Sequence, residues 1–315
     1  MVYETFQTIL TEKLSQRLGP DCRLLVQSVP KNNGITLDGL CISHKDSSVT
    51  PAIYLNNYFE QYQEGMSMEA IVEEIQQIYR EDSSLIHTDF SILNDFTKLK
   101  DKIVYKLVHT DANKELLKEI PSVPYLDLSI IFYLYLEENE TGQLTALIHN
   151  FHLAAWDTNT EELYKLAFQN TPICFPPDLK PMSQVMNDVL CQEMGSDELN
   201  HVVKDLSRSQ ARSPLYVLTN STGINGAGTI LYPHVLSNFS YQLNQDLVIL
   251  PSSIHEVLLV PYDETVSLNR LSDMVNQINQ AEVSVEEQLS DHVYYYSRES
   301  DQVLILQDSA TPAPC

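Results

Sequence analysis

The residues best suited to chemistry lie between Pro251 and Glu256, in the string PSSIHE. Ser253, His255 and Glu256 supply a nucleophile, a base and a carboxylate, the three residue types of a serine hydrolase. Residues this close in sequence cannot ordinarily place those groups in line, whereas Ser253 and Glu256 have the spacing of a helix capping box. The pattern therefore predicts a helical turn between two strands, with catalysis as the alternative.

A glycine-rich loop precedes this segment. Its G-x-x-G-x-G pattern resembles a phosphate cradle, but phosphate-binding patterns need glycines that lead straight into a helix. Here the apolar run from Thr229 to Leu231 intervenes, so we expect a wide hairpin loop around an Asn-Gly turn, with positive φ at Gly226. The loop is a candidate binding surface, made of Asn220, Gly223, Asn225, Gly226 and Gly228.

The sequence does not indicate a metal site or a disulfide framework. His149 and His152 fall on a predicted strand, where a spacing of three places them on opposite faces; they would converge only if the strand ended before His149. The five cysteines are scattered and form no C-x-x-C arrangement. We therefore expect no structural metal, no disulfide and no cofactor.

Hydrophobic patterns define the elements that must position these residues. Asn33-Gly34 between apolar runs predicts an antiparallel hairpin over 23–43, in which Gly39 is a candidate bulge. Strict apolar alternation over 126–136, followed by a partner strand at 144–151, predicts a second hairpin. Paired strands also separate the helices towards the C-terminus. This order favours an antiparallel α+β fold over a doubly wound α/β sheet.

The elements group into two or three sub-units. The string CFPPDLKP at 174–181 contains three prolines, which predicts an extended loop and the best boundary in the chain. We expect an N-terminal helix, sheet and two-helix unit at 1–85, a central hairpin unit at 86–175, a C-terminal α+β unit at 176–306, and a frayed tail at 307–315.

Charge limits the classes of partner. The chain has 43 acidic and 19 basic side chains, a net charge of −24. Such a chain lacks the clustered Lys and Arg that phosphate contacts need, which argues against binding to DNA, RNA or anionic lipid. The stretch from Val260 to Asp301 is especially acidic. If this charge does more than keep the protein soluble, the expected partner is a basic protein or peptide.

The N-terminal segment and the hydropathy predict the location. Acidic and polar residues interrupt every apolar run near the N-terminus, unlike a signal peptide, and no window approaches the ~18 apolar residues of a membrane span. Scattered, unpaired cysteines suit a reducing compartment. We therefore expect a cytoplasmic protein without a membrane segment; the sequence leaves its oligomeric state open.

Several strings together resemble an uncharacterised family, a domain of unknown function found in anaerobic Gram-positive bacteria. The resemblance spans nearly the whole chain and implies no activity, cofactor or catalytic residue. The strings are KNNGITLDGLCI (31–42), PAIYLNNYFEQYQEG (51–65), LYVLTN (215–220), INGAGTILYPHVL (224–236) and DLVILPSSIHEVLLVP (246–261).

Two functions remain open at this stage. The first is a non-enzymatic cytoplasmic protein-binding or adaptor module, because catalytic residue types do not converge in the sequence. The second is a hydrolase whose site lies between the 220–228 loop and the 251–256 turn. A pocket lined by both segments, with His255 facing a serine that is not its neighbour, would favour the hydrolase.

Overall fold

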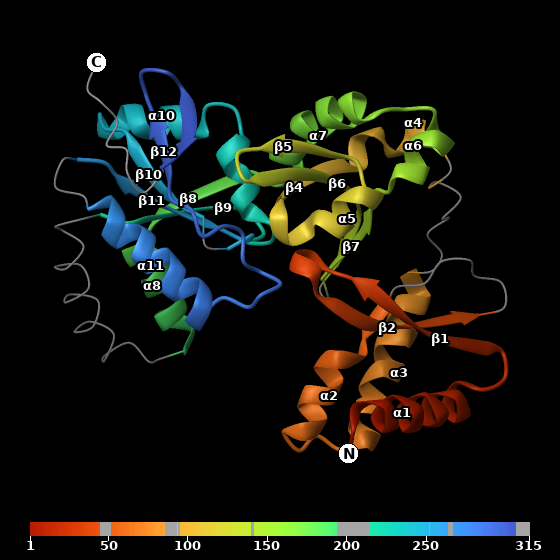
Figure 1. The fold of residues 1–315 in the computed structure, drawn as a ribbon. Helices are drawn as coiled ribbons and strands as arrows, with labels where there is room; N and C mark the ends of the chain where they lie inside the picture. The colour runs from red at the N-terminus through yellow and green to blue at the C-terminus, as the bar shows by residue number, and fades with distance from the viewer. Residues whose placement is uncertain are drawn as a thin grey trace. The chain divides into compact units, whose positions relative to one another are not determined.

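A computed structural model describes residues 1–44, 52–85, 93, 95–139, 142–193, 214–251, 253–263 and 267–306. It has an antiparallel α+β fold with three sheets (Figure 1). Two compact units share the chain: residues Met1–Lys100 with Glu138–Leu144, and residues Asp101–Glu137 with Thr145–Cys315. The sequence suggests a further boundary at 174–181, but both sides of that segment belong to the second unit.

The first unit packs helices on one face of a three-stranded sheet ordered β1-β2-β3. Its core joins Phe6, Leu10 and Leu14 of one helix to Leu40 and Ile42 of the sheet. Its main elements are α1 (Tyr3–Leu18), β1 (Cys22–Pro30), β2 (Thr36–His44), β3 (Ala52–Tyr54), α2 (Leu55–Gln63) and α3 (Met68–Leu85).

The hairpin predicted over 23–43 is confirmed. Asn33 and Gly34 take φ of 55° and 73°, the left-handed conformation that Asn-Gly turns favour. The bulge suggested at Gly39 is wrong, because the β1–β2 register runs unbroken through the Gln27–Gly39 pair. A glycine is needed there for close packing, since a Cβ would lie 3.0 Å from both Ala52 Cβ and Val29 Cγ2.

The second unit begins with a four-stranded sheet in which β6 pairs with β4, β5 and β7. The predicted hairpin of 126–151 is confirmed as β6 and β7, but its boundaries differ: Leu126 has φ of 55° in a turn, and the second strand ends at Leu147. The helix α4 (Phe96–Leu99) still belongs to the first unit, and the elements that follow it are β4 (Ile103–His109), α5 (Lys114–Glu119), β5 (Ser122–Tyr125), β6 (Leu128–Asn139), β7 (Gly142–Leu147), α6 (Asn150–Trp156) and α7 (Thr160–Cys174).

A six-stranded antiparallel sheet, ordered β13-β12-β10-β11-β9-β8, forms the rest of this unit. In Figure 1, α11 and α8 lie on one side of this sheet and α10 lies on the other. The elements are β8 (Pro177–Pro181), α8 (Met182–Glu193), β9 (Tyr216–Asn220), the 3₁₀ helix η5 (Gly226–Leu231), α10 (Val235–Leu243), β10 (Leu247–Leu250), β11 (Val257–Pro261), α11 (Leu268–Ala281), β12 (Tyr294–Ser297) and β13 (Gln302–Ile305).

Three local predictions in this region are wrong. The proline-rich segment 174–181 is not a loop: β8 pairs with β9 at the sheet edge, where a missing N–H is tolerated. The wide hairpin loop expected here is also wrong, because the run from Thr229 to Leu231 is 3₁₀ helix. Ser253 begins no helical turn and instead bridges to Gln288. The tail predicted at 307–315 lies outside the described residues.

The described helices differ from membrane-spanning helices in length or in hydropathy. None of them is both long enough and apolar enough to cross a bilayer.

Candidate functional site

The predicted loop and turn do meet in the structure. Thr219 Oγ1 donates to the carbonyl oxygen of His255 at 2.7 Å, and Ala227 N donates to the carbonyl oxygen of Ile254 at 3.1 Å. Asn225 N also donates to His255 Nδ1 at 3.3 Å. The contact is thus built largely from backbone groups, which fixes the two segments to each other.

His255 is not arranged as the base of a catalytic triad. Its Nδ1 accepts the Asn225 amide, and its Nε2 lies 3.6 Å from Glu287 Oε1. The Ser253 hydroxyl accepts from the backbone N of His255 and is hydrogen-bonded to the Glu256 carboxylate. Burial raises the pKa of Glu256, an effect that the nearby His255 and the Ser253 hydrogen bond oppose. Among the described residues, no serine hydroxyl is hydrogen-bonded to the His255 ring, which is the contact that a serine–histidine pair needs for acyl transfer.

The glycines of the candidate binding loop have structural roles. Asn225 and Gly223 have positive φ, at 55° and 71°, while Gly226 does not, so the prediction of positive φ at Gly226 is wrong. Gly226 is required by close approach: a Cβ there would lie 2.1 Å from Thr219 Oγ1 and 2.4 Å from the His255 carbonyl oxygen. At Gly228, a Cβ would lie 3.1 Å from the Tyr105 ring.

Asn220 organises the same loop from within. Its Oδ1 accepts from the backbone N of both Thr222 and Gly223, and its Nδ2 donates to the Ile224 carbonyl oxygen at 2.8 Å. Asn220 itself is buried. Because these amide groups are engaged inside the protein, the side chain holds the loop and is not presented to a ligand.

The two histidines do converge, because β7 ends before His149. His149 is the N-cap of α6, and its backbone N donates to His152 Nδ1 at 2.9 Å in a reciprocal capping box. Burial and the neighbouring His149 lower the pKa of His152. The pair caps a helix. Within the described ranges, no cluster of three or more His, Cys, Asp or Glu side chains could hold a metal ion.

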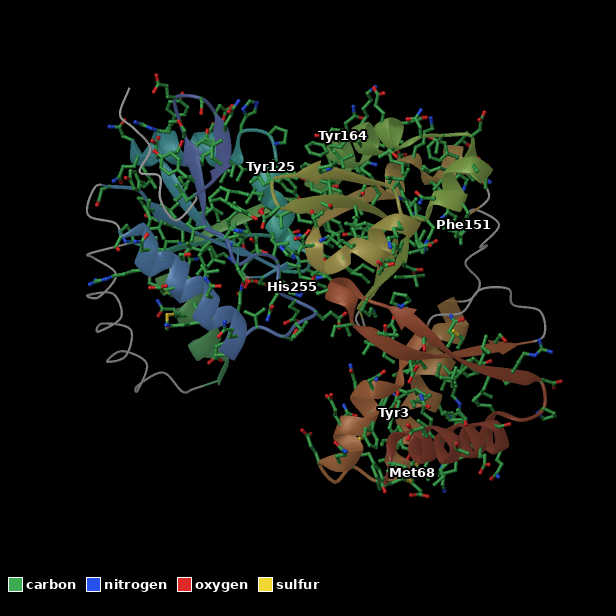
Figure 2. The ribbon with its side chains drawn as sticks, in the orientation of Figure 1. Tyr3, Met68, Tyr125, Phe151, Tyr164 and His255 are labelled. Atoms are coloured by element: carbon green, nitrogen blue, oxygen red, sulfur yellow. The ribbon has the colours of Figure 1, made fainter. Side chains whose placement is uncertain are left out.

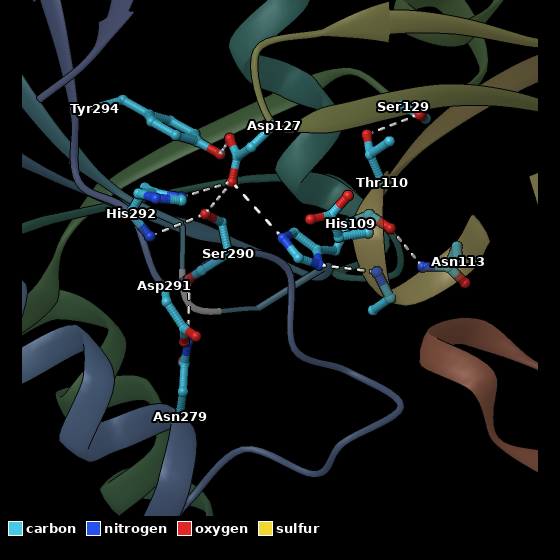
Figure 3. A network of polar contacts seen from close by, with 12 residues as sticks. His109, Thr110, Asn113, Asp127, Ser129, Asn279, Ser290, Asp291, His292 and Tyr294 are labelled. Carbon is cyan, nitrogen blue, oxygen red and sulfur yellow. Dashed lines mark hydrogen bonds and ion pairs between the residues drawn. The ribbon is translucent and has the colours of Figure 1, made fainter. Parts of the chain in front are cut away.

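A polar network around Asp127 was not predicted from the sequence (Figure 3). Asp127 lies in the turn between β5 and β6, and its side chain is only 14% exposed. Its Oδ2 accepts from Ser290 Oγ at 2.6 Å and lies 3.0 Å from His292 Nδ1, while its Oδ1 accepts from Tyr294 Oη at 2.6 Å. His109 Nε2 lies 3.9 Å from Oδ2.

Hydrogen bonding explains why the carboxyl group of this network is ionised although it is largely buried. Burial opposes ionisation of Asp127, but hydrogen bonds from Ser290, Tyr294 and His292 outweigh it and hold the pKa below its ordinary value. Tyr294 is fully buried, and its pKa is raised by burial and by Asp127. The network therefore joins a charged acceptor to two hydroxyl groups and an imidazole, and it ties the β5–β6 turn to the segment before β12.

No sequence signal identifies this network. Asp127 is 163 to 167 positions from Ser290, His292 and Tyr294, and in the sequence it is one polar residue of an alternating strand. The β5–β6 turn belongs to the four-stranded sheet and β12 to the six-stranded sheet, so the network forms between segments of two different sheets.

A second unpredicted feature is a cavity of about 360 Å³, named here the tyrosine cavity. It lies within the second unit, between the end of β5, the η5–α10 connection and the β12–β13 turn; Tyr125 is labelled in Figure 2. Its volume is within the ~300–1,000 Å³ typical of ligand sites. The residues that define it are Tyr125, Tyr232, Leu236, Tyr296, Asp301 and Val303.

The polar groups of the tyrosine cavity are partly engaged. Tyr296 Oη donates to Asp301 Oδ1 at 2.6 Å, and Tyr232 Oη donates to the Phe175 carbonyl oxygen at 2.9 Å. In the described part of the chain, the Tyr125 hydroxyl makes no hydrogen bond. Because Tyr232 and Tyr296 are nearly fully buried, the cavity offers the partly exposed Tyr125 side chain and the Asp301 carboxylate, beside the polar side chains of His234, Ser237 and Gln302. Neither Ser253 nor His255 lines it.

Comparison with known proteins gives a family and no activity. No curated protein and no solved structure matches the chain significantly. A family of unknown function, DUF5688, has a model that matches residues 3–298. Because this match covers nearly the whole sequence, the chain belongs to the DUF5688 family.

Proposed function

We propose that this protein is a non-enzymatic binding module for a basic protein or peptide. The observation that carries the proposal is the exposure of the acidic side chains in the C-terminal stretch. Glu286 is half-buried, and the other described acidic residues there are exposed: Asp263, Asp273, Glu282, Glu287, Asp291, Glu299 and Asp301.

Basic residues do little to offset this charge locally. Arg298 donates to Asn244 Oδ1 at 2.7 Å and lies 3.4 Å from Asp246, which is not one of these acidic residues. Arg270 is the other basic residue of the stretch. Exposed charge of one sign attracts a cationic partner over a distance and raises its encounter rate. The same field repels nucleic acid and anionic lipid.

The site geometry supports binding over hydrolysis. A hydrolase at the 220–228 loop and the 251–256 turn would need His255 to accept a serine proton, yet Nδ1 already accepts a backbone amide. Its Nε2 faces the carboxylate of Glu287. These contacts hold the two segments together, and among the described residues no serine hydroxyl is paired with the His255 imidazole.

Equilibrium binding tests the proposal. The full chain is titrated with three fluorescent peptides of equal length, one rich in Lys and Arg, one neutral and one acidic, at low salt. We expect saturable binding of the basic peptide alone. A turnover screen with ester and peptide substrates accompanies the titration, and hydrolysis that is lost on His255→Ala would overturn the non-enzymatic assignment.

Matched variants locate the binding surface. Asp273→Asn, Glu282→Gln and Glu299→Gln together remove three exposed acids from the C-terminal stretch. Glu60→Gln, Glu64→Gln and Glu73→Gln remove three exposed acids from the first unit. We expect the first triple variant to weaken peptide binding about tenfold and the second to change it little. Equal weakening by both would show that net charge alone attracts the peptide.

A further inference from the structure

The tyrosine cavity adjoins the acidic stretch through Asp301. This residue closes the turn between β12 and β13 with φ of 52°, next to the Ser297–Gln302 strand pair. Tyr296 Oη donates to its Oδ1, which holds the carboxylate at the cavity wall. An anionic group is thus fixed beside three tyrosine side chains.

A second polar group in the cavity is Tyr125. Its ring is the part of β5 that reaches the cavity, and burial raises the pKa of its hydroxyl to about 12, so the hydroxyl stays protonated at neutral pH. No hydrogen bond to it exists within the described residues. Tyr125 is half-buried and lines the cavity, so a hydroxyl without a partner among the described residues is available to a bound group.

We propose that the tyrosine cavity receives an arginine side chain of the basic partner, with Asp301 and Tyr125 as its polar contacts. This inference rests on the proposed function, since it names the group that the binding module recognises. Aromatic faces and a carboxylate together favour a cation, and the acidic surroundings reinforce that preference.

Arginine fits these groups better than lysine for a geometric reason. The guanidinium is planar and carries five N–H donors, so it can stack on a tyrosine ring while it donates to a carboxylate and a phenol in its plane. The lysine ammonium concentrates its donors on one strongly hydrated atom. Leu236 and Val303 supply the apolar wall that the methylene stem of the side chain would contact.

The test compares blocked amino acids and peptides on the full chain. N-acetyl-arginine methylamide, the matching lysine compound and the matching norleucine compound are titrated while amide chemical shifts are recorded. We expect arginine to shift residues around the cavity and to bind about tenfold more tightly than lysine. Equal affinity for arginine and lysine, or shifts confined to other surfaces, would overturn the inference.

Two variants and one control separate recognition from folding. Asp301→Asn removes the charge, and we expect about tenfold weaker binding of an arginine-containing basic peptide. Tyr125→Phe removes a hydroxyl that makes no internal hydrogen bond, so it should weaken binding severalfold while leaving the unfolding midpoint unchanged. Tyr241→Phe, at a tyrosine that is 65% exposed on α10, should change neither.

The outcomes distinguish this inference from the proposed function. If the basic peptide binds and neither cavity variant weakens it, the cavity assignment is overturned while the binding module stands. If the basic peptide does not bind the wild-type chain and arginine causes no shifts, both are overturned. Loss of arginine preference in Tyr125→Phe with an intact fold supports the assignment.

Discussion

At the residue scale, two glycines of this chain show that the same residue type answers different needs. Gly34 takes positive φ in an Asn-Gly turn, a local requirement that adjacent sequence reveals. Gly226 instead lies where another backbone segment approaches closely, and adjacent sequence gives no sign of that approach. The turn could therefore be predicted, while the reason for Gly226 required the folded structure.

Gly226→Ala should destabilise the protein strongly. The new Cβ would lie 2.1 Å from Thr219 Oγ1 and 2.4 Å from a carbonyl oxygen, so the loop must separate from the 251–256 turn. We expect a loss of about 3 kcal/mol in the free energy of unfolding, measured with urea. The comparison is Gly19→Ala, where space is open but φ is +84°, with an expected loss of about 1 kcal/mol. Equal losses would refute the close-approach explanation.

Asp127→Asn should also destabilise, because an amide cannot accept all three donors that the carboxylate accepts. Each hydrogen bond to a charged group contributes about 1.5–3 kcal/mol, so we expect a loss of about 2–4 kcal/mol at pH 7. Asp111→Asn is the comparison. Among the described contacts this residue makes one ion pair, which is exposed, so the loss in the free energy of unfolding should be under about 1 kcal/mol.

The pH dependence of Asp127 follows from the sign of its shift. Its pKa is lower in the folded state than the unfolded value of about 3.9, so its contribution is present above that value and is lost as the pH falls through the folded pKa. Urea unfolding of the wild type should weaken steeply below about pH 4, and the Asn variant should show a shallower decline. Parallel curves would contradict this assignment.

At the element scale, the ends of the strands depend on contacts that the period of apolar residues does not reveal. Apolar alternation predicted β6, although every residue from Leu128 to Leu134 is buried, so both faces of the strand are covered. The same pattern extended β7 through His149 and Phe151, since it carries no information about the capping box that begins α6. At β8 the prolines predicted a loop where the structure has a strand. The strand tolerates them because it lies at the edge of the sheet.

The N-terminus of α6 should be sensitive to mildly acidic pH. Burial and His149 lower the folded pKa of His152, so the unfolded chain takes up a proton first as the pH falls below about 6.5. Stability is therefore lost from that pH down to the folded pKa. Hydrogen exchange of the α6 amides should accelerate from pH 7 to pH 5.5, after correction for intrinsic rates. His152→Gln should reduce this acceleration, and an unchanged pH response in that variant would exclude His152 as its source.

At the scale of the whole molecule, the fold class was accessible from the sequence and the sites were not. Element order alone predicts antiparallel α+β, because paired strands between helices allow few other topologies. The Asp127 network and the tyrosine cavity each join segments more than a hundred positions apart, for which one sequence carries no pairing signal. The candidate loop and turn lie in contact, but the hydrogen bonds between them hold the two segments together and form no catalytic arrangement.

The association rate of a basic peptide against salt tests the central claim most directly. Screening lengths fall from ~30 Å at 0.01 M to ~10 Å at 0.1 M, so a partner attracted by the exposed acids must associate more slowly as salt is added. Stopped-flow fluorescence should show a rate that falls by about tenfold over this range, with a weaker dependence in the Asp273→Asn, Glu282→Gln, Glu299→Gln variant. A rate independent of salt, or one that falls equally in that variant, would contradict the account.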